Sequence, residues 1–194
     1  MLSIRVETDI EVGEPDEDAG LVTWWDVSIT WAAPDGEGAP TSIGKVRAAT
    51  IHVGAALNAG VAMADVLDAD SAELEALYDV FFDGNVLREE FESGVGDGLL
   101  YIADIEMPDV WRQRGADLAV VHQLGDAIGM GCGLIILPPD ASAQEARWAR
   151  LGFEATSEAG YLYREQSVVS PRVVAAADDC FEVIPGRQPP HDDD

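Results

Sequence analysis

Apolar and polar residues alternate along the first sixty residues in the pattern of half-buried β-strands. Three segments carry this pattern: residues 2–11, 21–31 and 43–53. In the first, Ile4 and Val6 stand between charged residues, while the second is rich in β-branched and aromatic side chains. A turn containing Pro and Gly at residues 33–38 separates the second segment from the third. Because successive side chains of a strand point to opposite faces of a sheet, the pattern predicts an antiparallel β-meander over residues 1–60.

Between residues 61 and 97 the apolar spacing becomes helical. Ser71 offers an N-cap, and acidic residues follow in the first turn, where the helix dipole favours them. The apolar residues after the cap keep helical spacing: Leu74, Leu77, Tyr78 and Phe81. The sequence Asp-Gly-Asn at residues 83–85 is expected to end this helix, and residues 86–92 are expected to form a further short one.

In the second half of the chain, the sequence pattern predicts a strand, a turn, a helix, a strand and a helix, in this order. A strand over residues 98–107 leads through a turn at 112–118 into a helix that reaches about residue 130. A second apolar strand over residues 132–138 is followed by a short helix that ends in Leu-Gly-Phe at residues 151–153. The pattern is weaker beyond Arg164, where residues 168–177 read as a strand or a loop.

This order of elements predicts the α/β class, more closely α+β, with a mixed, mostly antiparallel central sheet flanked by helices. One domain is expected over residues 1–165, made of the meander (1–60), the helical segment (61–97) and the second half (98–165). Residues 166–194 are expected to form a C-terminal extension that ends in a disordered acidic tail over residues 185–194.

The chain is strongly acidic, with 37 Asp and Glu residues against 11 Lys and Arg among 194 residues, a net charge of −26. Such a surface repels nucleic-acid phosphates and anionic lipids, so no direct nucleic-acid binding and no membrane partner are expected. No apolar run approaches the roughly 20 residues of a membrane span, and the N-terminus lacks a signal-peptide layout, which makes a cytoplasmic location the default expectation. The acidity has two readings: solubility in high salt, or attraction of cationic ligands.

Cysteine and histidine are sparse. Cys132 and Cys180 lie far apart, and the histidines are scattered at positions 52, 122 and 191. Neither a disulfide framework nor a metal site is predicted.

The turn at residues 112–118 is the strongest candidate for chemistry. A strand that feeds a helix through a glycine-containing turn exposes backbone N–H groups at the helix N-terminus, where they and the helix dipole attract anions. Arg112 and Arg114 place two of the few basic residues beside that helix start. The sequence therefore predicts a phosphate-binding turn.

Together with Arg112, Gly115 and the Leu-Gly-Phe ending, the strand–turn–helix–strand–helix order resembles the acyl-CoA-binding half of the GNAT N-acetyltransferase superfamily, of which this chain looks like a divergent member. The resemblance covers about residues 61–164. It implies acetyl-CoA as cosubstrate and, as acceptor, an amine of a small molecule or of a protein. It further implies that pantetheine lies along Ile105, Glu106 and Met107, and that Arg112 and the N–H groups of the turn hold the pyrophosphate: Gln113, Arg114, Gly115, Ala116 and Asp117.

Four features depart from the family pattern. Asp117 stands where the family has a small residue, and Pro108 lies one residue farther from Arg112 than usual. Trp148 stands where the family often has a Tyr that serves as general acid. The helical segment falls after the third strand, whereas the family usually has it between the first two. These departures keep open an alternative, a catalytically inactive GNAT-like scaffold with a binding or regulatory role. One form of it is an acidic decoy of a nucleic-acid-binding protein.

Asp104 and Glu106 are the candidates for a general base. They alternate along one strand and so share a face, where partial burial would raise the pKa of one of them and suit it to deprotonate an ammonium. The structural alternative is a salt bridge with an arginine. Tyr101 is a candidate acid, whereas Tyr161 and Tyr163 are expected to be packing residues.

Two further groups of side chains leave alternatives open. The acidic residues at 68–75 and 89–92 read as solvated helix faces, or as the lining of a cleft for a cationic amine. Trp24, Trp25 and Trp31 fit a sheet core, a homodimer interface or a stacking platform for a ligand.

Overall fold

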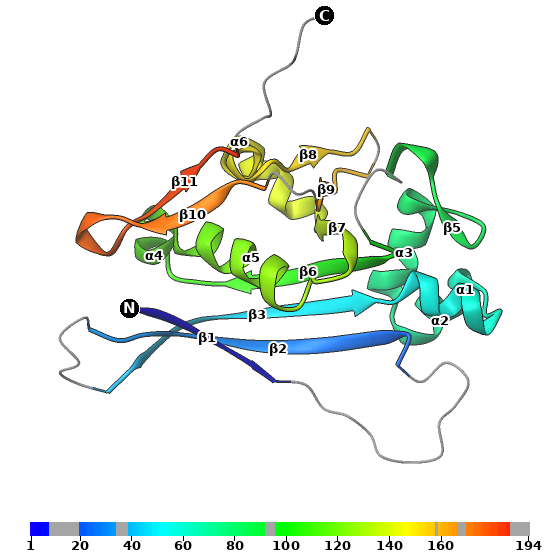
Figure 1. Ribbon diagram of the computed structural model, residues 1–194, viewed down its shortest axis with the longest axis horizontal. Helices are drawn as coiled ribbons and strands as arrows, with labels where there is room; N and C mark the ends of the chain where they lie inside the picture. Colours follow the sequence, from blue (N-terminus) through cyan, green and yellow to red (C-terminus); the bar gives the residue numbers. More distant parts are fainter. Residues whose placement is uncertain (8–19, 34–38, 92–95, 158, 167–169, 187–194) are drawn as a thin grey trace, which may run out of the picture.

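The computed structural model describes residues 1–7, 20–33, 39–91, 96–157, 159–166 and 170–186. A seven-stranded sheet with the order β1-β2-β3-β6-β7-β9-β8 forms its centre (Figure 1). Its strands are β1 (Leu2–Glu7), β2 (Val22–Trp31), β3 (Thr41–Ile51), β6 (Gly98–Glu106), β7 (Cys132–Leu137), β8 (Glu154–Ala155) and β9 (Leu162–Glu165). Neighbouring strands are antiparallel except β6 and β7, which are parallel. The predicted fold class is confirmed.

The N-terminal meander follows the alternation in the sequence. Along β2, Val27 and Ile29 are buried on one face, while Asp26 and Ser28 are exposed on the other. The meander ends in a short helix, α1 (Val53–Ala59), which starts where the strand pattern was expected to finish.

Helices α1, α2 (Met63–Asp70) and α3 (Ala72–Phe81) gather at one end of the sheet (Figure 1). They lie between β3 and β6 in the chain, as the sequence predicted. Ser71 caps α3 by accepting a hydrogen bond from the N–H of Leu74, and Leu74, Leu77 and Phe81 are buried against the sheet.

The short helix predicted over residues 86–92 forms only in part, as a 3-10 helix, η1 (Glu89–Phe91). Before it, the chain forms a tight hairpin of β4 (Phe82–Asp83) and β5 (Val86–Leu87), and residue 92 lies outside the described residues. Gly84 has φ 59°, which lets the chain reverse, and Asn85 accepts a hydrogen bond from the N–H of Met63. Arg88 then donates to the carbonyl oxygens of Phe82 and Asp79, so its side chain fastens the hairpin to the end of α3.

The other face of the sheet is covered by the second half of the chain. Its helical elements are α4 (Asp109–Gln113), α5 (Ala116–Ala127), η2 (Pro139–Gln144), α6 (Glu145–Trp148) and η3 (Ala149–Leu151). Gly152 follows η3 with φ 84° and ends this helical run.

A C-terminal hairpin of β10 (Arg172–Ala175) and β11 (Phe181–Ile184) packs on the outside of α5 (Figure 1). Val173, Phe181 and Val183 contact the core, and His122 of α5 lies 2.8 Å from the carbonyl oxygen of Pro171. Helix α5 is therefore enclosed by the sheet on one side and the hairpin on the other. The expected disordered tail at residues 185–194 falls mostly on 187–194, outside the described residues.

Candidate functional site

The pairing of the parallel strands β6 and β7 ends half-way along β6 and near the end of β7. Their pairing runs from Gly98 to Tyr101 of β6, although β6 itself continues to Glu106. On its other edge β6 stays paired with β3 through a bulge, because Arg47 faces Asp104 and Ala48 faces Ile102, so Ala103 is an extra residue. Such a bulge bends the strand that carries it. Beyond Tyr101, β6 continues past the end of β7, and a gap lies between this part of β6 and the end of β7.

A pocket of about 100 Å³ occupies this gap. Its lining comes from both strands, α4, η2 and α6: Ile102, Ala103, Asp104, Ile105, Arg112, Leu137, Pro138, Asp140, Ala141, Gln144 and Trp148. Trp148 is buried and packs edge-on against Phe153, so it forms a wall of the pocket.

Helix α5 begins beside the gap. Gly115 precedes it with φ 80°, a left-handed conformation that favours glycine, and provides no side-chain cap. The N–H of Ala119 is the first in the helix to bond back to Gly115, which leaves the N–H groups of Ala116, Asp117 and Leu118 without partners inside the helix. The N–H groups of Arg114 and Gly115, which the sequence also assigned to a phosphate, donate instead to Trp111 and Arg112.

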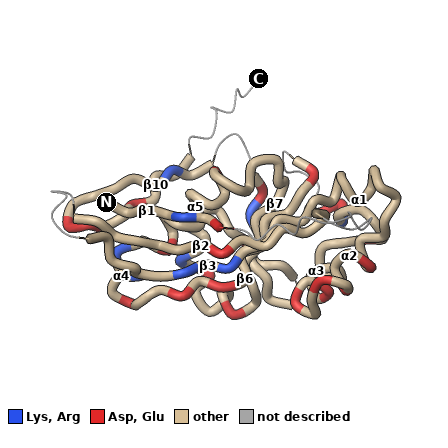
Figure 2. Tube along the Cα trace, turned by 90° about the horizontal axis from the view of Figure 1, so that it is seen from below, with Lys and Arg blue, Asp and Glu red and all other residues tan. Residues whose placement is uncertain are grey.

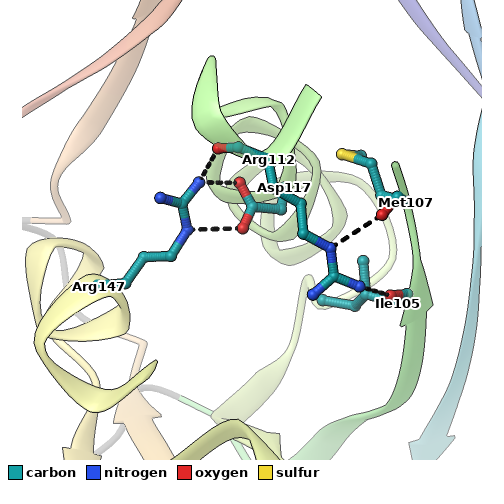
Figure 3. Close-up of polar contacts among 5 residues, drawn as sticks. All are labelled: Ile105, Met107, Arg112, Asp117 and Arg147. Carbon is teal, nitrogen blue, oxygen red and sulfur yellow. Dashed lines mark hydrogen bonds and ion pairs between the residues drawn. The ribbon is translucent and has the colours of Figure 1, made fainter. Parts of the chain in front are cut away.

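Asp117 does not face the gap. Its carboxylate is buried, with 2% of the side chain exposed, and forms a bidentate ion pair with Arg147 of α6 (Figure 3). The two contacts are 2.7 Å from Nε to Oδ2 and 2.5 Å from Nη2 to Oδ1, and Nη2 also donates to the carbonyl oxygen of Arg112. Hydrogen bonding to Asp117 raises the pKa of Arg147, against the opposing effect of burial. The negative charge of Asp117, which would repel a phosphate, is thus balanced by Arg147 inside the protein.

Arg112 points away from this pair, toward Ile105 and Met107 (Figure 3), and its side chain lines the pocket. Its guanidinium donates from Nη2 to the carbonyl oxygen of Ile105 at 2.7 Å and from Nε to that of Met107 at 3.0 Å. The predicted site residues Ile105, Met107 and Arg112 are therefore brought together, but they bond to one another.

The C-terminal hairpin touches the same turn. The N–H of Phe181 donates to the carbonyl oxygen of Arg114 at 2.7 Å, and Arg114 pairs with Asp179 at 3.8 Å while its guanidinium stacks on Trp111. A Cβ atom at Gly115 would meet the carbonyl oxygen of Phe181 at 2.7 Å. Gly115 is therefore required both for its backbone conformation and for this close approach, while Gln113 is exposed.

Asp104 and Glu106 share a face of β6, opposite Arg47 and Lys45 of β3. The bulge at Ala103 puts them on the face that carries α1–α3, but β6 has run past those helices here (Figure 1). Both side chains are exposed, so the partial burial expected of the general base is absent.

Glu73 and Asp70, which the sequence left as part of a solvated helix face or of the lining of a cleft, belong to a cluster on the same side of the sheet. Glu73 of α3 accepts a hydrogen bond from the hydroxyl of Tyr101 at 2.9 Å and pairs with Arg47 at 3.3 Å. Arg47 stacks on Trp24, 3.8 Å from the ring centroid, and Trp24 donates to Asp70. The sequence contains one sign that Glu73 lies near the sheet: it stands four residues before the buried Leu77, so it borders the apolar face of α3.

The tyrosines of this face are held neutral. Burial first, and then the hydrogen bond to Glu73, raise the pKa of Tyr101 far above its usual value. Burial also raises the pKa of Tyr161, which packs against Phe81, and of Tyr163, which packs against Phe91. The packing role predicted for Tyr161 and Tyr163 is confirmed.

The three tryptophans of β2 all have contacts within the chain. Trp25 donates to Thr50 Oγ1, and Trp31 packs on Trp111 with ring centroids 5.1 Å apart. With Trp24 under Arg47, these contacts favour a structural role over a stacking platform for a ligand.

Two kinds of site are absent from the part of the chain that the structure describes. No group of three or more His, Cys, Asp or Glu side chains there could hold a metal ion. Nor does any helix in those ranges combine the length and the apolar character needed to cross a membrane.

Comparisons with known proteins give one weak likeness. No protein-family model matches the chain, and no curated protein does. Among solved structures, the chain is similar to one in the crystal structure of a KacTA–DNA complex, with a TM-score of 0.40 and 10% identity over 84% of this chain and 93% of that one.

Proposed function

We propose that this protein is a GNAT-like N-acetyltransferase that transfers an acetyl group from acetyl-CoA to an amine. The observation that carries the proposal is the end of the β6–β7 pairing half-way along β6, beside the N-terminus of α5. The part of β6 that β7 does not pair offers its backbone groups to an extended ligand. The adjoining start of α5 offers N–H donors to the phosphates of that ligand. A cytoplasmic location, with its supply of acetyl-CoA, belongs to the same proposal.

The residues of the turn fit the phosphate end of such a ligand. The N–H groups of Ala116, Asp117 and Leu118 point along the helix axis as anion donors. Because Arg147 neutralises the Asp117 carboxylate, that residue contributes its N–H group without presenting a free negative charge. Arg112 stands next to these donors and can supply a positive charge.

The thioester end would lie along the open edge of β6. In direct transfer, the amine nitrogen attacks the thioester carbonyl carbon, the N–C bond forms, the C–S bond breaks, and CoA leaves as the thiolate. The surplus ammonium proton passes to Asp104 or Glu106, directly or through water. The N–H groups of β6 polarise the carbonyl oxygen. Trp148, whose indole is no useful acid, takes no part in protonating the thiolate.

The acceptor side of the sheet carries more acidic than basic side chains. Asp104, Glu106, Glu73 and Asp70 lie on the face that carries α1–α3, together with Arg47 and Lys45. A net charge of −26 adds a long-range attraction for cations. These features favour a cationic amine as acceptor.

Calorimetric titration with acetyl-CoA and with CoA, at low and at high salt, tests the proposal. Micromolar binding supports it, and absence of binding at millimolar ligand under both salts refutes it. After binding is found, release of free CoA thiol is followed with amines of increasing positive charge. Asp104→Asn and Glu106→Gln are compared with wild type, and loss of the true base should lower the rate by about 10²- to 10⁴-fold.

A second candidate is an inactive scaffold that binds a protein partner. It is favoured by the closed state of the gap, in which Arg112 takes the backbone oxygens and the pocket measures only about 100 Å³. The decoy form of this candidate needs carboxylates in rows along one face. Figure 2 shows Asp and Glu spread over α2, α3, β6 and other elements, which disfavours it.

A further inference from the structure

The end of β6 and the residue that follows it, Met107, present two carbonyl oxygens that no strand pairs. A Cβ atom at Gly44 of β3 would meet the carbonyl oxygen of Glu106 at 2.5 Å, so this oxygen points toward β3. Carbonyl groups alternate in direction along a strand, and those of Ile105 and Met107 therefore point toward the gap. A buried, unpaired carbonyl is costly, and here one guanidinium satisfies both.

The same two oxygens are what an extended ligand would need. An arm that pairs with this edge of β6 must bond to the backbone groups of Ile105 and Met107. Arg112 already occupies those oxygens and forms one wall of the pocket. At about 100 Å³ the pocket is well below the roughly 300–1,000 Å³ typical of small-molecule sites.

The side chain of Arg112 can move while its backbone stays in place. The carbonyl oxygen of Arg112 accepts hydrogen bonds from the N–H of Gly115 and from Arg147, and neither contact involves the Arg112 guanidinium. Release of the two β6 oxygens thus requires only side-chain rotation. The Asp117–Arg147 pair holds the turn during that change.

We propose that Arg112 is a latch, which closes the gap between β6 and β7 in the ligand-free protein and is displaced when the acyl-pantetheine arm enters. This inference rests on the proposed function and concerns the regulation of the same site. The arm exchanges with the guanidinium at Ile105 and Met107, so the ligand must compete with an internal contact. A fragment of acetyl-CoA that lacks the phosphates must displace the guanidinium without any binding free energy from phosphate contacts.

S-acetylpantetheine, which lacks the phosphates, separates the latch from simple phosphate binding. Arg112→Met keeps the aliphatic stem and removes the donors, so it should bind S-acetylpantetheine about tenfold more tightly than wild type, the order of one charge-assisted hydrogen bond. The affinity for acetyl-CoA should rise less, because the variant also loses a positive charge beside the phosphates. Arg150→Met, at an exposed arginine of η3, makes the same change in net charge and should leave both affinities unaltered.

Each outcome decides between the possibilities. If Arg112→Met weakens acetyl-CoA binding and leaves S-acetylpantetheine unchanged, Arg112 only binds phosphate and the latch is overturned. If neither ligand binds to any of the proteins, the proposed function fails and the latch fails with it. If the Met variant does not fold by circular dichroism, Arg112→Lys takes its place. Its single ammonium cannot span both oxygens as the guanidinium does, and it should give a smaller tightening; no tightening would overturn the latch.

Discussion

The Asp117–Arg147 pair should be one of the more costly polar contacts to break, and the cost should be unequal between its partners. Asp117 is 2% exposed, whereas the Arg147 side chain is 23% exposed. Arg147→Met leaves a buried carboxylate with no cation, and removal of one partner of a buried pair costs about 3–5 kcal/mol. Asp117→Asn leaves an arginine that can reach water and still bond to Arg112, so about 1–2 kcal/mol is expected.

Urea denaturation followed by circular dichroism measures both free energies of unfolding. For a protein of this size the larger loss corresponds to a fall in melting temperature of about 10 °C. In the double variant, Arg147→Met should add little to Asp117→Asn, because the carboxylate that needed the cation is gone. Arg5→Met is a matched control, since Arg5 pairs with Glu7 at side-chain exposures of 78% and 57%. That change should alter stability by less than about 0.5 kcal/mol.

The reasoning is refuted if Arg147→Met costs no more than Asp117→Asn, or if it costs no more than the Arg5 control. Either result would mean that water or a neighbouring group already compensates the carboxylate. It would also remove the reason for expecting Asp117 to be harmless to a phosphate.

Three further predictions concern other parts of the fold. Burial and the charge of Asp97 raise the pKa of the Cys132 thiol to about 11, so its contribution to stability is full below pH 9 and is lost as the pH rises toward 11. Over that range the free energy of unfolding from urea titrations should fall by about 2 kcal/mol in the wild type, and Cys132→Ala should remove this fall. Asp178, at the tip of the C-terminal hairpin, has φ 57°, so Asp178→Gly should raise the melting temperature by about 1–3 °C and Asp178→Val should lower it. Gly44→Ala places a methyl group 2.5 Å from the carbonyl oxygen of Glu106 and should destabilise the β3–β6 pair by about 1–3 kcal/mol in the same urea assay, whereas an unchanged midpoint would contradict the close approach.

Local patterns predicted what depends on local spacing. The meander, the Ser71 cap and the strand–turn–helix order around Gly115 follow from hydrophobic periodicity and from turn and cap residues close together in the sequence. The position of the helices after the third strand was visible for the same reason. The order of the elements along the chain does not determine that β6 pairs with β7, nor that this pairing ends half-way along β6.

The features that shape the candidate site depend on contacts between distant residues. Asp117 and Arg147 are separated by 30 positions, and neither residue type marks its partner in the sequence. One sign of the hairpin over α5 is present in the sequence. The apolar positions of this helix are too many for a helix with one solvated face: Leu118, Val120, Val121 and Leu124. The bulge at Ala103 leaves no such sign, since alanine fits either face of a strand.

The extra residue at Ala103 has a consequence for how related chains diverge. Side chains on a regular strand alternate with a period of two, so the gain or loss of one residue normally turns every later side chain to the opposite face. Here the bulge absorbs the extra residue, because Ile102 and Asp104 stand opposite the adjacent residues Ala48 and Arg47. Deletion of Ala103 would therefore restore regular pairing and leave Asp104 and Glu106 on the face that they occupy now. A lineage could thus gain or lose this residue through a single-codon insertion or deletion while the acidic pair keeps its place. An alignment without a gap at this position would equate residues that lie on opposite sides of the sheet.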